Sequence, residues 1–156
     1  MFEKQRNAFS KIIVRRHLYQ DYDDPELLKI EIAALKGEIG SVIELYCYPQ
    51  QLLEIGKILY SFPTKYRDEY CYEEGSEDPA KRFLYFFKMR IYTYTPSECA
   101  IEFSMHLNLE EPYGYKTNFT LYPLYASDLR RLGESFMTFS ELKLMEFEWS
   151  SHENFF

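Results

Sequence analysis

One amphipathic pattern, L-x-x-[I/L]-G-x-x-[L/F]-x-x-F, occurs twice in the chain. It covers residues 52–62 (LLEIGKILYSF) and residues 129–139 (LRRLGESFMTF), at an offset of 129 − 52 = 77 residues. Its apolar positions recur at steps of three and four, which places them on one face of a helix. The pattern therefore predicts two amphipathic helices, at about 50–62 and 127–139. Pro49 suits the start of the first helix, and Ser127 is the expected N-cap of the second.

Each predicted helix carries a glycine at the same position, Gly56 in the first and Gly133 in the second. A glycine inside a helix costs about 1 kcal/mol relative to alanine. Two glycines at equivalent positions therefore suggest that the backbone approaches a neighbour closely at both places. The neighbour is either the other helix or the sheet beneath each helix.

Alternating apolar and polar residues predict strands before and between the helices. The clearest case is residues 99–109 (CAIEFSMHLNL), where apolar residues occupy every second position. Residues 83–95 are rich in aromatic and β-branched side chains, which favour strands. Further strands are expected at residues 11–18, 27–35, 41–47, 117–122 and 143–149.

The offset of 77 residues suggests an internal duplication. It places Leu28, Ile30 and Ile32 on Met105, Leu107 and Leu109. The chain is therefore predicted to be a single α+β domain over residues 1–156, β-rich and antiparallel. Two βββα units are expected at about 10–62 and 83–139, with a linker at 63–82 and a final strand at 143–149. The expected core side chains are Leu52, Leu59, Phe103, Met105, Leu107, Leu132 and Phe136.

The linker, residues 63–82, breaks the periodic pattern and is both acidic and rich in tyrosine. A loop of this length in a compact domain is usually either functional or disordered. Tyrosines supply contact area, and carboxylates attract basic partners. We therefore predict a partner-binding surface in this loop, formed by Tyr66, Asp68, Glu69, Tyr70, Tyr72, Glu73, Glu74, Glu77 and Asp78.

The charge of the chain is uneven. The net charge is −7, and residues 1–18 carry +4, which leaves −11 for the remainder. An acidic body disfavours nucleic-acid binding, which depends on neutralising phosphates, and it suits a basic protein partner. No apolar run reaches the roughly 20 residues of a membrane helix, and the first residues lack the apolar region of a signal peptide. We expect a cytoplasmic protein.

The sequence offers no catalytic or metal-binding motif. Its three cysteines are odd in number and lack metal-ligand spacing, and Cys47 and Cys99 lie in apolar runs that suit the core. Glu102, Ser104 and His106 share the predicted wet face of one strand, where parallel side chains do not converge as a catalytic triad does. We therefore expect no enzyme activity, catalytic residue, metal or cofactor.

The chain resembles the small acidic immunity proteins that accompany bacterial polymorphic toxins. The resemblance lies in its size, in the strand-then-helix segment VIELYCYPQQLLEIGKILYSF (residues 42–62), in its acidic segments with tyrosines and in its β-rich second half. It implies an α+β protein without enzymatic activity that neutralises a cognate toxin by direct binding. The alternative is a protein that binds a small molecule or lipid in an aromatic pocket between sheet and helices.

Overall fold

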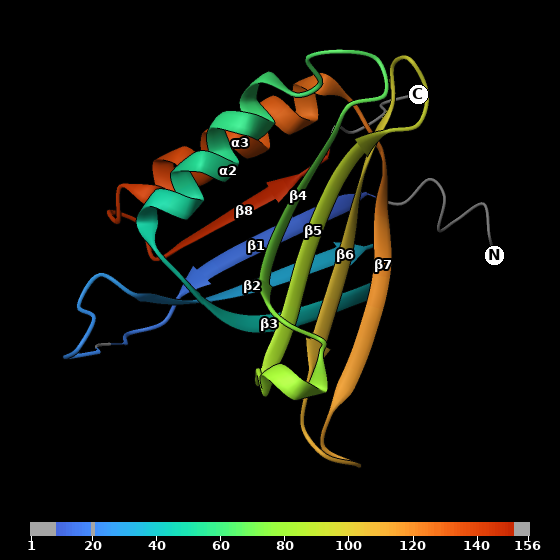
Figure 1. Ribbon diagram of the computed structural model, residues 1–156. Coiled ribbons are helices and arrows are strands. Elements are labelled where there is room, and N and C mark those ends of the chain that lie inside the picture. The colour runs from blue at the N-terminus through green and yellow to red at the C-terminus, as the bar shows by residue number, and fades with distance from the viewer. Residues whose placement is uncertain (1–8, 20, 152–156) are drawn as a thin grey trace.

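The computed structural model describes residues 9–19 and 21–151 and contains two antiparallel sheets and a pair of helices (Figure 1). The strands of one sheet run across those of the other, and the helices lie side by side along the last strand of the chain. The α+β, antiparallel fold class is thus confirmed. The elements are β1 (Ser10–Arg16), β2 (Leu28–Lys36), β3 (Ile39–Cys47), α2 (Pro49–Ser61), β4 (Glu69–Gly75), η1 (Pro79–Lys81), β5 (Tyr85–Thr93), β6 (Cys99–Leu107), β7 (Tyr115–Leu124), α3 (Ala126–Ser140) and β8 (Glu146–Ser150).

Each sheet is completed by a strand that follows a helix. The strand order is β3-β2-β1-β8 in the first sheet and β4-β5-β6-β7 in the second. β8 comes after α3 and pairs with β1, whereas β4 comes after α2 and pairs with β5. After α2 the chain therefore passes to the second sheet through β4, and after α3 it returns to the first sheet through β8. The internal duplication itself stays a prediction.

A constant offset of 77 residues does not relate the middle strands of the two sheets. β2 begins at Leu28 and β6 at Cys99, so Leu28 takes the place of Cys99 rather than that of Met105. The cause is an exchange of loop lengths. The connection before β2 is long and the turn after it is short, whereas the connection before β6 is short and the turn after it is long.

The two glycines lie where the helices touch each other. A Cβ atom added to Gly133 would lie 2.6 Å from both the carbonyl oxygen of Gly56 and the backbone nitrogen of Tyr60. A Cβ atom on Gly56 would lie 2.8 Å from the carbonyl oxygen of Gly133. Close backbone approach is confirmed, and the neighbour is the other helix rather than a sheet.

The start of each helix is fixed by the side chain of its third residue. The Gln51 Oε1 atom accepts a hydrogen bond from the Tyr48 N–H at 2.7 Å, and the Asp128 Oδ2 atom accepts one from the Tyr125 N–H at 2.9 Å. The N-cap of the second helix is therefore Tyr125, and the prediction of Ser127 was wrong. Pro49 is the first residue of α2, as expected.

The core lies between the two sheets and the helix pair. Six of the seven predicted core side chains are buried, among them Phe103 and Leu132 at 0 % exposure. Leu107 is the exception, being only half-buried, because it ends β6 at the rim of a pocket described below. Cys47 and Cys99 are buried as expected.

The linker contains a strand, so the prediction of one long loop was wrong. Residues 69–75 form β4, which pairs with β5 along its whole length. Exposed and half-buried residues alternate from Glu69 to Glu74, and Tyr70 and Tyr72 pack against the hydrophobic core. Hydrophobicity alone does not reveal this period of two, because the segment contains several carboxylates.

Candidate functional site

The residues predicted to bind a partner are divided between the two faces of β4. Side chains alternate across a strand, so neighbouring residues of β4 point in opposite directions. Tyr70, Tyr72 and Glu74 point inward and are half-buried, whereas Glu69 and Glu73 are exposed on the outer face. The nine residues therefore do not form one continuous surface.

The inward members stabilise the fold. The Glu74 Oε1 atom accepts hydrogen bonds from Gln51 Nε2 and from the Tyr72 hydroxyl, both at 2.7 Å, and so links α2 to β4. Burial, together with this hydrogen bond to Glu74, raises the pKa of the Tyr72 hydroxyl. Glu74, Tyr70 and Tyr72 are consequently poor candidates for contact with a partner.

Tyr66 and Asp68 lie on the connection that leads into β4. The Tyr66 ring is 60 % exposed and is available for contact. The Asp68 carboxylate accepts hydrogen bonds from the Thr64 N–H and hydroxyl and from the Glu69 N–H. The hydrogen bond from the Thr64 backbone, above all, lowers the pKa of Asp68. Asp68 therefore fixes the entry to the strand.

The outer face of β4 carries the accessible charge. The Glu69 carboxylate pairs with Arg90 on the neighbouring strand, which offsets its charge. Glu73 is exposed. Lys88 lies opposite it in the pairing of β4 with β5, but no salt bridge joins Glu73 to a cation among the residues that the structure describes. Of the two glutamates that point outward from β4, Glu73 is therefore the one whose charge is left for a partner.

The free edge of β4 is the most distinctive feature of this region. Thr93 N–H donates to Asp68 C=O, and Ser76 N–H donates to Tyr85 C=O, so the even-numbered residues bond to β5. In an antiparallel pair the residues between them direct their backbone groups away from the partner strand. The N–H and C=O groups of Cys71 and Glu73 thus point outward, and within residues 9–19 and 21–151 no other strand pairs with them.

Within the described residues, each of the four sheet edges carries at least one hydrogen bond between a side chain and the backbone, and β3 carries two. On β3, the Tyr115 hydroxyl donates to the Val42 carbonyl oxygen at 2.9 Å, and the Tyr85 hydroxyl accepts from the Tyr46 N–H at 3.2 Å. On β7, Lys36 Nζ donates to the Tyr122 carbonyl oxygen. On β8, Arg131 Nη1 donates to the Ser150 carbonyl oxygen at 3.0 Å. In the described part of the chain, the backbone edge of β4 carries one such contact, from Asp68 to the Glu69 N–H at its first residue.

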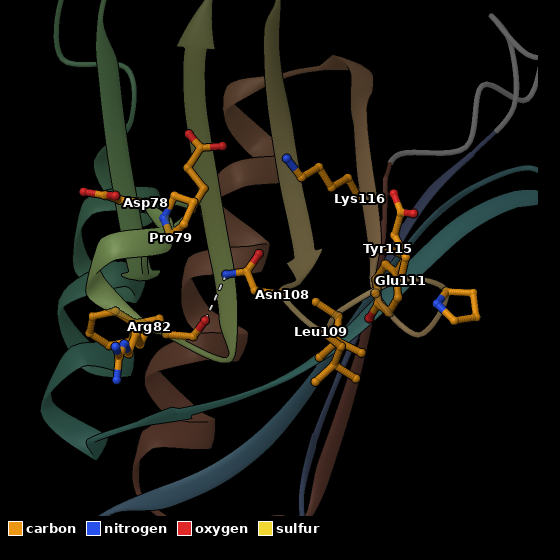
Figure 2. Close-up of a pocket in the computed structure, with 13 residues that line it drawn as sticks. Asp78, Pro79, Arg82, Asn108, Leu109, Glu111, Tyr115 and Lys116 are labelled. Carbon is orange, nitrogen blue, oxygen red and sulfur yellow. Dashed lines mark hydrogen bonds between the residues drawn. The ribbon is translucent and has the colours of Figure 1, made fainter.

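Glu77 and Asp78, the last two predicted residues, line a pocket of about 590 Å³ beyond the end of β4. Figure 2 shows Asp78, Pro79 and Arg82, in and next to η1, on one side of this pocket and Glu111, Tyr115 and Lys116 on the other. Asn108 lies between the two sides, and its Nδ2 atom donates to the carbonyl oxygens of Ser76 and Phe83. The lining mixes both signs of charge and suits a small polar ligand better than a lipid.

His106 lies close to this pocket but is not on a wet face, so that prediction was wrong. Its side chain is 6 % exposed, and both the Glu77 carboxylate and the Phe86 ring on β5 lie against it. The Nε2 atom lies 3.3 Å from Asn118 Oδ1, and the Nδ1 atom lies 3.7 Å from Glu77 Oε2. Neither nitrogen contacts Ser104, so the structure gives no support to the arrangement of Glu102, Ser104 and His106 as a triad.

The space between the sheets and the helices is filled with side chains. Phe87, Phe103, Phe136 and Phe139 all lie there at no more than 1 % exposure. The pocket of 590 Å³ lies on a different part of the surface and has no lining residue from either α2 or α3. An aromatic pocket under the helices, which the ligand-binding alternative requires, therefore has no support from the packing.

Comparisons with protein-family models, with curated protein sequences and with solved structures find no match to this chain. Among the described residues, neither helix has the length and apolar character needed to cross a membrane.

Proposed function

We propose that this chain is a non-enzymatic, cytoplasmic binding protein of the bacterial immunity type, which neutralises a cognate toxin by direct contact. The observation that carries the proposal is the open, acidic edge of β4, with outward backbone groups at Cys71 and Glu73. The resemblance in size, charge and strand-helix order to immunity proteins supplies the biological class.

An open sheet edge can bind an extended segment of another protein as an additional strand. In that mode main-chain hydrogen bonds supply affinity, and the side chains at alternate positions supply specificity. A basic segment fits here because Glu73 is exposed and the chain has a net charge of −7. The same negative charge discourages two copies of β4 from pairing with each other.

A small polar ligand in the pocket near η1 is the second candidate function. The observation in its favour is the volume of about 590 Å³, within the range of small-molecule sites. Its lining carries two acidic residues, Asp78 and Glu111, and two basic residues, Arg82 and Lys116, and this mixture favours a zwitterion over a lipid. A ligand that co-purifies with the protein would support this candidate.

The proposal predicts that acidic side chains near β4 accelerate association with a basic partner. The product of the gene next to this one is the partner to test, by surface plasmon resonance at two ionic strengths. Glu73→Gln combined with Glu77→Gln should slow association, and the effect should be larger at low salt, where screening is weakest. Glu74 is left unchanged because it links α2 to β4.

The matched control is Glu38→Gln combined with Glu134→Gln. It removes the same charge from exposed positions on the β2–β3 turn and on α3. Equal association rates for the two double variants would show that the charge near β4 has no special role. If the neighbouring gene product does not bind the wild-type chain, the immunity proposal gives way to the small-ligand candidate.

A further inference from the structure

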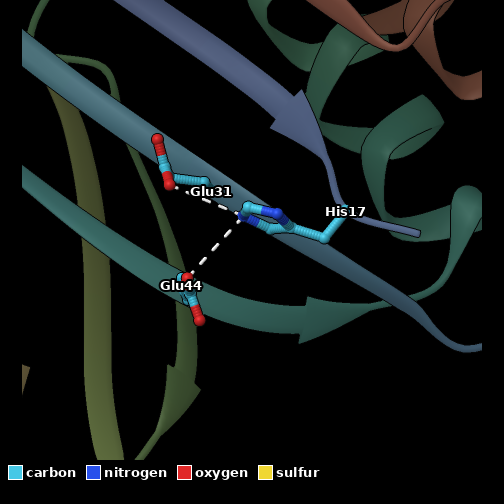
Figure 3. A group of neighbouring side chains, drawn as sticks. All are labelled: His17, Glu31 and Glu44. Atoms are coloured by element: carbon cyan, nitrogen blue, oxygen red, sulfur yellow. Dashed lines mark ion pairs between the residues drawn. The ribbon is translucent and has the colours of Figure 1, made fainter. Parts of the chain in front are cut away.

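Three potential metal ligands converge on the outer face of the first sheet. His17 directly follows β1, Glu31 lies on β2 and Glu44 lies on β3. Glu31 and Glu44 are opposite each other in the pairing of their strands, and the His17 N–H donates to the Lys29 carbonyl oxygen. Figure 3 shows the imidazole ring pointing between the two carboxylates.

The geometry leaves one nitrogen of His17 without a hydrogen bond. The Nε2 atom lies 3.5 Å from Glu31 Oε2 and 3.7 Å from Glu44 Oε1, and the three ligand atoms lie within 4.8 Å of one another. Within the described residues, Nε2 is closed off from solvent and has no hydrogen-bond partner. A buried polar atom in this condition costs free energy unless something satisfies it.

We propose that His17, Glu31 and Glu44 bind a zinc ion. Zinc binds imidazole nitrogen and carboxylate oxygen at about 2.0–2.2 Å in a tetrahedral arrangement. That arrangement separates the ligand atoms by about 3.4 Å, close to the distances of Nε2 from the two oxygens. The imidazole ligand favours zinc over calcium and magnesium, which prefer sites made entirely of oxygen.

Neighbouring cations hold the two carboxylates in the orientation that the site needs. Arg15 lies 3.6 Å from Glu31 Oε1, and Lys29 lies 3.3 Å from Glu44 Oε2. Each glutamate thus turns one oxygen to a cation and the other to His17. Such contacts behind the ligands orient them and tune affinity. The same positive charges repel a metal ion, so we expect weaker binding than at a fully enclosed structural site.

A protonated His17 paired with both glutamates is the competing arrangement, because it would also satisfy Nε2. The two differ in what they require: zinc needs the neutral imidazole, whereas the ion pair needs the charged one. Zinc binding to the first sheet is independent of the proposed contact at β4, so either can fail without the other.

The test is zinc titration of the tag-free, full-length protein by isothermal titration calorimetry at neutral pH. The wild-type chain should bind one zinc ion, and His17→Gln, Glu31→Gln and Glu44→Gln should each weaken binding by more than about tenfold. Glu148→Gln is the control. It removes a carboxylate from the same face, where Glu148 pairs with Lys11, and should leave zinc affinity unchanged.

Nitrogen NMR of the wild-type histidine side chains adds a readout that does not depend on the folding of any variant. Zinc should shift the Nε2 resonance of His17 and leave that of His106 in place. The absence of zinc binding by the wild-type chain would overturn the proposal. Binding that survives all three cluster substitutions, or that shifts other histidines instead, would overturn it as well.

Discussion

At the scale of single residues, the three cysteines differ in environment. Cys71 is exposed on the outer face of β4, whereas Cys47 and Cys99 are buried in the core. Burial raises the pKa of Cys47 to about 12 and that of Cys99 to about 11. The pKa of Cys71 is also raised, by partial burial first and then by the charge of Glu73. Because the thiolate is the reactive form, all three thiols should react more slowly than free cysteine.

Thiol labelling therefore reports on the fold. In the native protein at neutral pH, Ellman's reagent should modify Cys71 slowly and leave Cys47 and Cys99 intact. In denaturant, all three should react quickly. Cys71→Ala is the control, and it should abolish labelling of the native protein. Rapid native modification of two or more thiols would contradict the burial described for the core.

At the scale of elements, the close contact between α2 and α3 depends on the two glycines. Gly56 and Gly133 allow the backbones of the two helices to touch, and a methyl group at either position would meet backbone atoms. Alanine favours a helix over glycine by about 1 kcal/mol. Overpacking of this kind costs typically about 1–3 kcal/mol in addition to any local effect, because the helices would have to separate.

Gly133→Ala should therefore destabilise the protein by up to about 2 kcal/mol, which is the overpacking cost less the gain of about 1 kcal/mol from the better helix propensity of alanine. Urea denaturation followed by circular dichroism measures the change. Glu134→Ala, at the next and exposed position of α3, is the control and should change stability by less than about 0.5 kcal/mol. If Gly133→Ala stabilised the protein, the helices would not be in contact at this position.

The spacing of apolar side chains determines which helices and strands the sequence predicts. Both helices and the strands with strict alternation could be predicted because their apolar side chains recur at the period of the element. β4 was missed because its inward side chains are Tyr70, Tyr72 and Glu74, which do not read as an apolar face. The sequence did not indicate His17, Glu31 and Glu44 as candidate metal ligands because they come from separate elements, so no short spacing marks them.

At the scale of the whole molecule, strand pairing determines which surface is open. Sequence patterns give the positions of strands but not their partners. The pairing of β4 with β5 and of β8 with β1 therefore became visible only in the structure. That pairing leaves β4 at one edge of the second sheet. The acidic residues of the predicted linker, residues 63–82, lie on and next to this edge strand. The candidate binding surface is therefore smaller than the nine residues predicted from the sequence, and it includes the outward backbone groups of Cys71 and Glu73.

Amide hydrogen exchange, followed residue by residue with NMR, tests the open edge of β4 most directly. In the free protein the amides of Cys71 and Glu73 should exchange quickly, whereas those of Tyr70 and Tyr72, which bond to β5, should be protected. The neighbouring gene product, which we propose as the basic partner, should protect the Cys71 and Glu73 amides as well when it is added. Unchanged exchange at these two amides in a saturated complex would contradict docking on this edge.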